Sequence, residues 1–88
     1  DVGISGLHVA TYVVTTGSSL ANKTLLDIKL TALPNTSIVL IKRGEEIIFN
    51  VYPSTSLHPN DIVVIMGEPQ ILDKVAKLFK LGIAIHVP

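Results

Sequence analysis

The 88-residue sequence contains no cysteine, which excludes a disulfide framework and thiolate ligands for a metal. It also has no excess of charge of either sign, because seven basic residues balance seven acidic ones. The basic residues form no dense run. We therefore expect no nucleic-acid binding of the kind that depends on neutralising phosphates.

Long apolar runs are missing as well. No run approaches the ~18 residues that a membrane helix requires. The N-terminal residues 1–6 have no basic region typical of a signal peptide. These absences predict a soluble cytoplasmic protein with no direct membrane insertion.

Signatures of catalysis and metal binding are also absent. Adjacent Glu45 and Glu46 would point to opposite faces of a strand or lie in solvent, which is poor geometry for acid/base catalysis. His58 and Asp61 flank Pro59 and Asn60, a pattern that first indicates a turn. No histidine has a second histidine or cysteine at ligand spacing; the three are His8, His58 and His86. A metal site at His58 and Asp61 is the alternative to the turn. The sequence predicts a protein that is not an enzyme and that holds no metal.

Apolar residues are abundant for so short a chain. They make up 48% of the sequence, mostly as Ile, Val, Leu and Ala, since aromatic residues make up only 5%. Eighty-eight residues form one small domain, whose surface is large relative to its volume. Part of the apolar surface should therefore remain exposed in a monomer and indicate a partner. We expect a homodimer or a higher oligomer.

Hydrophobic periodicity predicts an α+β domain in residues 8–88, after a leader or linker remnant in residues 1–7. The expected order is β-α-β-β-β-α, with a possible extra C-terminal strand. The predicted elements are a strand at 8–16, a helix at about 22–33, a hairpin at 37–51, a strand at 62–66, a helix at 69–80 and the apolar tail 83–88. Hairpin connections favour a mostly antiparallel sheet with two helices on one face.

Local signals define the two predicted helices. Asn22 would cap the first helix and Pro34 would end it. Pro69 suits the first position of the second helix, and Gly82 suits its C-terminal cap. The second helix has the clearer apolar stripe, formed by Ile71, Leu72, Val75, Leu78 and Phe79.

The hairpin has its turn near Gly44, a residue suited to positive φ. Simple alternation places Ile38, Leu40 and Lys42 on one face of the strand. The other face would carry Val39, Ile41 and Arg43. Because both faces carry apolar residues, we expect a partner to cover the second face of the sheet.

Arg43 is the only arginine and ends an apolar strand. Its planar guanidinium suits a phosphate or a carboxylate, so it is a candidate ligand or interface contact. The alternative is a solvated turn residue or a pair with Glu45 or Glu46. Lys42 and Asn50 are weaker companions, and with Ile41 they complete the predicted ligand-binding set. Replacing Arg43 by Ala should weaken nucleotide binding by roughly tenfold while the fold survives.

Three segments together resemble the TrkA-C domain, the C-terminal half of regulators of potassium conductance. The segment from Ser19 to Leu30 resembles the family's "Gly-Lys-Thr-Leu-x-Glu-Leu". The run from Ile38 to Gly44 resembles "Val-x-x-Ile-x-Arg-x-Gly". The stretch from Pro53 to Gly67 resembles "Pro-x-x-x-x-Leu-x-x-Gly-Asp-x-Leu-x-Val-x-Gly". Asn22 and Asn60 replace two family glycines, and Asn also tolerates left-handed backbone.

The resemblance implies a non-enzymatic regulatory and dimerisation module of a potassium or other monovalent-cation transporter or channel. It implies a Rossmann-type TrkA-N subunit or domain as a partner, and a membrane transporter at the inner face of the membrane. It implies no cofactor in this chain, although a nucleotide or cyclic dinucleotide is a candidate ligand. From another class, an ACT-like amino-acid-sensing domain of a metabolic enzyme is an alternative, as is a bare oligomerisation domain.

Overall fold

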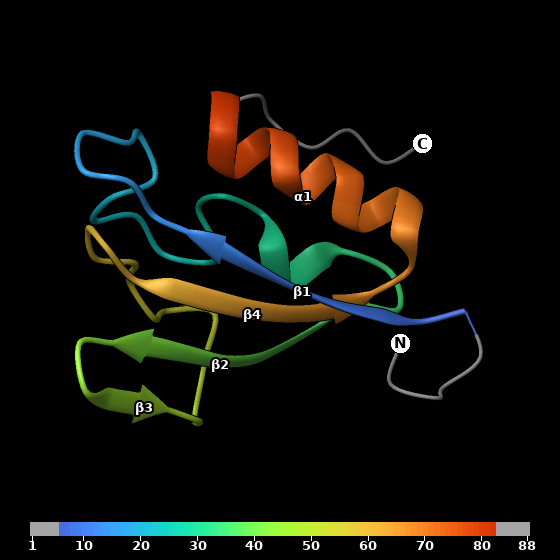
Figure 1. The fold of residues 1–88 in the computed structure, drawn as a ribbon, viewed down its shortest axis with the longest axis horizontal. Helices are drawn as coiled ribbons and strands as arrows, with labels where there is room; N and C mark the ends of the chain where they lie inside the picture. Colours follow the sequence, from blue (N-terminus) through green and yellow to red (C-terminus); the bar gives the residue numbers. More distant parts are fainter. Residues whose placement is uncertain (1–5, 83–88) are drawn as a thin grey trace.

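The computed structural model describes residues 6–82 and shows a four-stranded sheet with one α-helix packed on it in that part of the chain (Figure 1). The strand order is β1-β4-β2-β3, and every neighbouring pair is antiparallel. The elements are β1 (His8–Val13), the 3₁₀ helix η1 (Leu30–Ala32), β2 (Ser37–Arg43), β3 (Glu46–Ile48), β4 (Ile62–Gly67) and α1 (Pro69–Leu81). The predicted α+β class and antiparallel sheet are confirmed.

The apolar strand β4 lies inside the sheet, between β1 and β2, as its unbroken run predicts. Its side chains alternate, so Val63 and Ile65 are completely buried while Val64 is only half-buried. The β2–β3 hairpin turns at Gly44, whose φ is +60°. Only the absence of a Cβ makes that backbone conformation inexpensive.

The predicted alternation along β2 is wrong at its start, because an irregularity in the β2–β4 register lies between Ile38 and Leu40. Ile38 pairs with the buried Ile65 and packs against the core. Leu40 pairs with Val64 on the opposite face. The extra residue shifts the side-chain alternation, so Ile38 and Ile41 share the core face.

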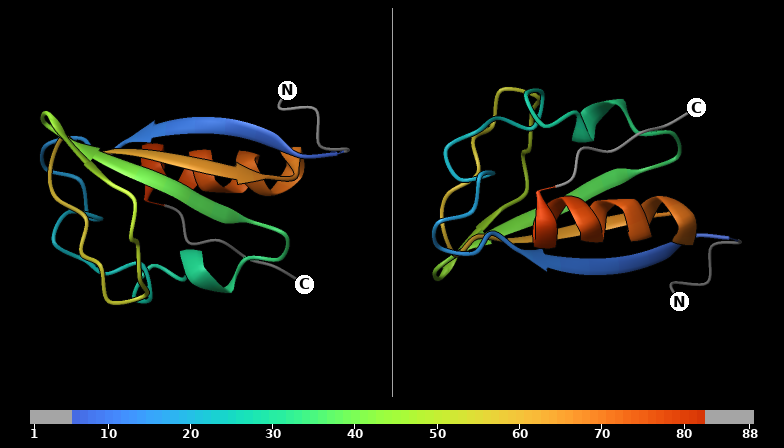
Figure 2. Two further views of the ribbon diagram at one scale, coloured as in Figure 1. Left: turned by 90° about the horizontal axis from the view of Figure 1, so that it is seen from below. Right: turned by 90° about the horizontal axis from the view of Figure 1, so that it is seen from above.

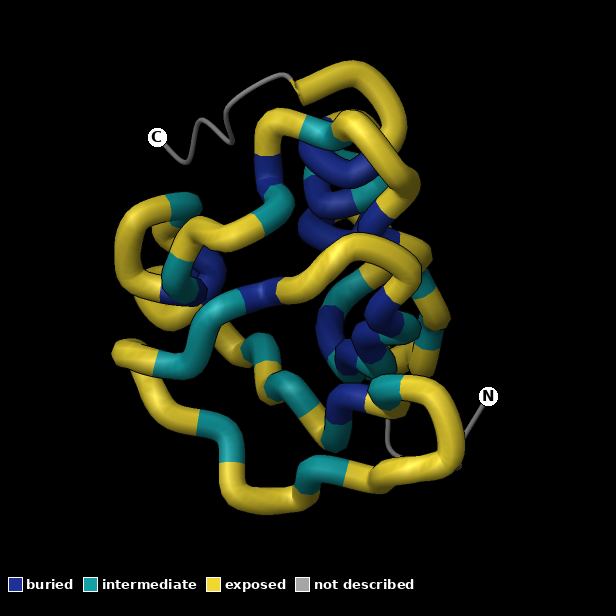
Figure 3. Tube along the Cα trace, turned by 90° about the vertical axis from the view of Figure 1, so that its left-hand side faces the viewer, coloured by how far each residue is buried: buried dark blue, intermediate teal, exposed yellow. Residues whose placement is uncertain are grey.

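The core lies on one face of the sheet, between the strands and α1 (Figures 2 and 3). The whole predicted stripe of α1 is buried, and Gly82 caps the helix with φ +69° and an N–H bond to the Leu78 carbonyl. Pro69 occupies the start of the helix as predicted. The segment before β2 completes the core with Leu20, Leu25, Leu30 and Leu33.

The predicted first α-helix is not confirmed. Residues 22–33 form successive turns that end in η1. Asn22 adopts φ +68°, which is left-handed backbone and not a helix cap. The amides of Leu25 and Leu26 donate to the carbonyls of Thr55 and Pro53, so this part of the backbone pairs with the 53–57 loop, and only isolated turn bonds, such as Ile28 to Thr24, form within the segment.

Two further predictions fall partly or wholly beyond the described residues. The possible C-terminal strand at 83–88 lies outside them, as do residues 1–5 of the predicted leader. Within residues 6–82, α1 is too short and too polar to cross a membrane, and no other helix there is longer.

Candidate functional site

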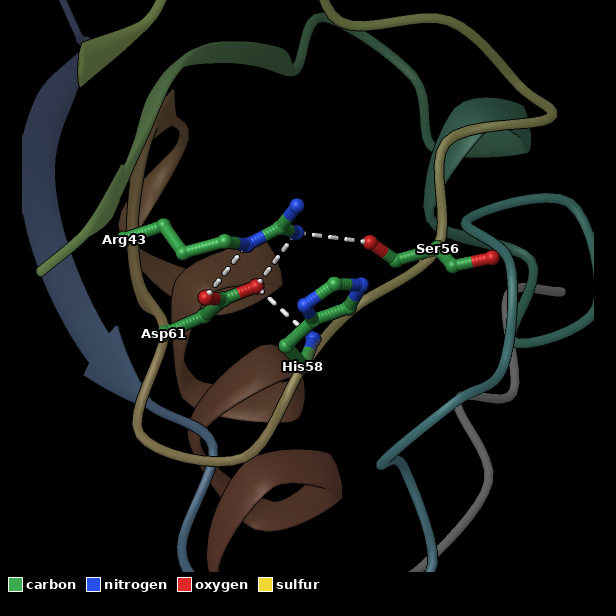
Figure 4. Close-up of polar contacts among 4 residues, drawn as sticks. All are labelled: Arg43, Ser56, His58 and Asp61. Carbon is green, nitrogen blue, oxygen red and sulfur yellow. Dashed lines mark hydrogen bonds and ion pairs between the residues drawn. The ribbon is translucent and has the colours of Figure 1, made fainter. Parts of the chain in front are cut away.

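Arg43 at the end of β2 and Asp61 just before β4 form a two-pronged ion pair (Figure 4). The Arg43 Nε–H donates to Asp61 Oδ1 at 3.0 Å, and Nη2 donates to Oδ2 at 2.9 Å. Nη2 also donates to the Ser56 carbonyl at 3.0 Å. The His58 backbone N–H donates to Asp61 Oδ2 at 2.8 Å. One guanidinium therefore joins the hairpin to the connection between β3 and β4.

The carboxylate of Asp61 is the buried partner. Its side chain is 1% exposed, whereas that of Arg43 is 28% exposed. Burial alone would raise the pKa of Asp61, but the hydrogen bonds from Arg43 and from the His58 amide outweigh it and lower the pKa. The hydrogen bond to Asp61 in turn raises the pKa of Arg43. Both groups therefore stay ionised near neutral pH.

A tight turn delivers Asp61 to this position. Asn60 adopts φ +72°, and its amide donates to the Val14 carbonyl at 2.6 Å. The Asp61 amide donates to the His58 carbonyl at 3.1 Å, which closes the turn. Asn tolerates this left-handed conformation better than most residues, as expected where the family has Gly. His58 itself is exposed and contributes its backbone to the pair.

Sequence reasoning missed the role of Asp61, which it assigned to a turn. The available signal was the arginine at the end of one apolar strand and an aspartate at the start of another. The expectation that Arg43→Ala leaves the fold unaffected is revised, because that change would leave a buried carboxylate without its cation, and we now predict that it destabilises the fold. The alternative of a pair with Glu45 or Glu46 is also wrong, since both hydrogen-bonded carboxylate contacts go to Asp61.

The four predicted ligand residues lie in different environments. Lys42 is exposed on the face of the sheet opposite the core, since its neighbour Ile41 is completely buried. A ligand at the surface therefore cannot contact Ile41 in this arrangement. Asn50 is exposed in the loop after β3. Arg43 Nη1 makes no hydrogen bond within residues 6–82, so one edge of the guanidinium is available as a donor.

Two hollows formed by residues 6–82 lie away from these four residues. One open cleft of about 290 Å³ lies between the 15–19 loop and the end of α1. Another of about 250 Å³ lies between η1 and the start of β2, with Leu25 and Val51 in its wall. Within residues 6–82, no three His, Asp or Glu side chains come together to hold a metal.

The chain is similar in sequence to two potassium uptake proteins. The chain is 40% identical over 76 residues to the Ktr system potassium uptake protein A of Vibrio alginolyticus, covering 86% of this chain and 32% of that protein. It is 37% identical over 54 residues to the Ktr system potassium uptake protein C of Bacillus subtilis (strain 168), covering 61% of this chain and 24% of that protein. The chain therefore spans about a quarter to a third of these relatives.

Solved structures with the same fold include the RCK C domain of the potassium transport protein KtrA in complex with cyclic diadenosine monophosphate. That domain has a TM-score of 0.69 and 25% identity, with 81% of each chain covered. The RCK C domain dimer of BusR from S. agalactiae, in complex with the same ligand, has a TM-score of 0.70 at 16% identity, covering 83% of this chain and 96% of that one. The model of the TrkA-C domain matches residues 9–80, and the chain belongs to the TrkA-C family.

Proposed function

We propose that this chain is a ligand-sensing and dimerisation module that regulates a potassium transport assembly. The observation that carries the proposal is the family match over residues 9–80 together with the two Ktr potassium uptake relatives. The chain covers at most 32% of either relative. A Rossmann-type TrkA-N partner, a membrane cation transporter and a cytoplasmic location at the inner face of the membrane are therefore parts of the proposal.

The proposed ligand is a cyclic dinucleotide, a class that the KtrA and BusR domains bind in their solved complexes. In this chain, the Lys42 ammonium, exposed on the sheet face opposite the core, suits one of its phosphates. The Nη1 edge of Arg43 is a second donor near the hairpin, on a side chain that is only 28% exposed. Asn50 adds an amide after β3. Charge-assisted hydrogen bonds of this kind contribute about 1.5–3 kcal/mol each.

Two other assignments are weaker. The ACT-like alternative is superseded by the family match. A BusR structure contains promoter DNA, but this chain covers only 38% of that BusR chain at 16% identity. The balanced charge of the present chain favours our prediction of no nucleic-acid binding. A bare oligomerisation domain differs from the proposed module only in binding no ligand.

Isothermal titration calorimetry on the 88-residue chain tests the ligand directly. Cyclic diadenosine monophosphate should give saturable heat, and the matched linear dinucleotide should bind at least tenfold more weakly, because its ends are free to rotate and lose more entropy on binding. Replacing the exposed Asn50 by Ala should weaken binding without changing the fold. Absence of heat with cyclic dinucleotides, NAD and ATP would reduce the chain to a bare oligomerisation domain.

A further inference from the structure

A cleft of about 200 Å³ lies on the core side of the fold, between the 19–29 segment and the C-terminal end of α1 (Figure 1). None of the residues assigned to the cyclic dinucleotide lines this cleft. Lys42 lies with Val64 on the opposite face of the sheet, which we call the outer face. The cleft is therefore a separate surface of the same domain.

The wall of the cleft is apolar. Leu20 and Leu78 are core residues that are 3% and 4% exposed, and Ile28 packs against the same core. At about 30 Å³ for each water molecule, the cleft has room for about seven waters or for one small organic molecule. An apolar group placed on this wall is removed from water, which favours a ligand with a short apolar body.

Three charged residues line the same cleft: Lys23, Asp27 and Lys29. Within residues 6–82, neither lysine ammonium forms an ion pair or a hydrogen bond. Asp27 Oδ2 accepts the Thr24 amide at 3.2 Å, whereas Oδ1 accepts no hydrogen bond from that part of the chain. Two ammonium groups and one carboxylate oxygen are therefore available to a ligand.

Lys29 occupies a backbone position that suits glycine. The Ile28 amide donates to the Thr24 carbonyl at 3.2 Å, which forms a single turn. The Leu30 amide donates to the Leu25 carbonyl at 3.1 Å, the long bond of a Schellman motif, and Lys29 is its left-handed residue with φ +63°. The other non-glycine residues with positive φ within residues 6–82 are all asparagines, which tolerate this conformation better. Backbone strain at a lysine that lines a cleft indicates a role for its side chain.

We propose that this cleft binds a zwitterionic α-amino acid with an aliphatic side chain. The carboxylate of the ligand lies between the Lys23 and Lys29 ammonium groups, its ammonium donates to Asp27 Oδ1, and its side chain lies on the apolar wall. A ligand with a carboxylate alone would place an anion opposite Asp27. A ligand with an ammonium alone would face two lysines. The site goes beyond the proposed cyclic dinucleotide and gives the module a second ligand.

An NMR titration of the ¹⁵N-labelled 88-residue chain with L-leucine tests the site. Leucine should shift the amide signals of residues 19–29 and 78–82 until they saturate, with a Kd on the order of 1 mM for a ligand of this size. Isocaproate has the same carboxylate and side chain but no amino group. It should bind about tenfold more weakly, because it leaves Asp27 without a partner and opposite an anion. Isoamylamine lacks the carboxylate and should give no saturable shift.

Two variants assign the roles of the charged residues. Glycine relieves the strain at φ +63°, so Lys29→Gly should be more stable than the wild type in urea denaturation. The same variant should bind leucine about tenfold more weakly, and a merely structural lysine would not move stability and binding in opposite directions. Asp27→Asn keeps an acceptor for the Thr24 amide but loses the negative charge, so it should bind leucine and isocaproate equally.

Lys77→Met is the matched control, because Lys77 is an exposed lysine of α1 that does not line the cleft. It should bind leucine as the wild type does. The proposal is overturned by a wild type whose signals do not respond to leucine, or by shifts confined to residues outside the cleft. It is also overturned by unchanged leucine binding in Lys29→Gly, or by equal binding of leucine and isocaproate to the wild type. None of these results involves a cyclic dinucleotide, so the proposed function is tested separately.

Discussion

Lys42 and Arg43 are adjacent cations of one strand, yet the sheet gives them opposite tasks. Arg43 lies on the core side, where it joins the hairpin to the buried carboxylate of Asp61. Lys42 lies on the outer face among apolar residues and is exposed. The two cations at this end of β2 therefore differ: Arg43 is mainly engaged in holding the fold together, and Lys42 is exposed to solvent.

The same division occurs along β4. Val63 is completely buried against the core, while Val64 is half-buried on the outer face. Neighbouring residues of one strand therefore report separately on the two surfaces of the sheet. Pairs of identical substitutions can test whether stability belongs to the core side and association to the outer face.

The largest difference should separate Arg43→Ala from Lys42→Ala. Arg43→Ala leaves Asp61 buried and unpaired, so it should lower the free energy of unfolding by about 3 kcal/mol, at the lower end for a broken buried pair. We expect the lower end of this range because the Arg43 side chain is 28% exposed, so the pair is only partly buried. Lys42→Ala should change stability by less than about 0.5 kcal/mol. Urea denaturation measures both.

Arg43→Lys refines this prediction. A lysine ammonium cannot reproduce the planar two-pronged contact with Asp61. The free energy of unfolding of Arg43→Lys should therefore lie between those of the wild type and Arg43→Ala. Denaturation is measured below the dimer dissociation constant, so that association does not contribute. Equal stability of the two alanine variants would show that the ion pair does not distinguish the faces.

The next largest difference should separate Val63→Ala from Val64→Ala. Val63→Ala removes buried methyl groups and leaves a cavity, so it should cost about 2 kcal/mol. Val64→Ala should cost the monomer less than about 1 kcal/mol, because its side chain keeps part of its contact with water. The order should reverse in sedimentation, where Val64→Ala should weaken dimerisation more. Equal effects of the two substitutions in both assays would show that the two faces of the sheet do not differ in their contributions to stability and association.

Regular periodicity predicted most of the fold. The i, i+1, i+4, i+7 stripe of α1 and its Pro69 and Gly82 boundaries are local signals, and all of them are confirmed. The strand predicted at 8–16 is present as β1, although it ends at Val13. These signals succeed because each depends on residues close in sequence.

Long-range contacts decided what the sequence did not predict. Leu25 belongs to a helix-like pattern, but its amide bonds to Thr55, thirty residues later in the chain, and the segment forms turns. The irregularity after Ile38 depends on the pairing with β4. For the candidate site, the sequence singled out Arg43 and Lys42, and simple alternation correctly placed them on opposite faces, but it did not tell which of the two faces covers the core. The contact between Arg43 and Asp61 was likewise not predicted, because the two residues are 18 positions apart in the sequence.

The smallest expected effect is the pH dependence that Asp61 adds. Its pKa is lower in the folded protein than in the unfolded chain, so the pair contributes its full stabilisation above the unfolded pKa of about 4. As pH falls below that value, the unfolded chain takes up a proton first, and the stabilisation is lost until the folded carboxyl is also protonated.

Asp61→Asn cannot titrate. The variant should therefore be less stable than the wild type at pH 7, and the difference should narrow as the pH falls below about 4 in urea denaturation. The other carboxyl groups are common to both proteins and leave the difference unaffected. Parallel stability curves would mean that the charge of Asp61 contributes nothing, and that its hydrogen bonds alone hold the hairpin to the turn before β4.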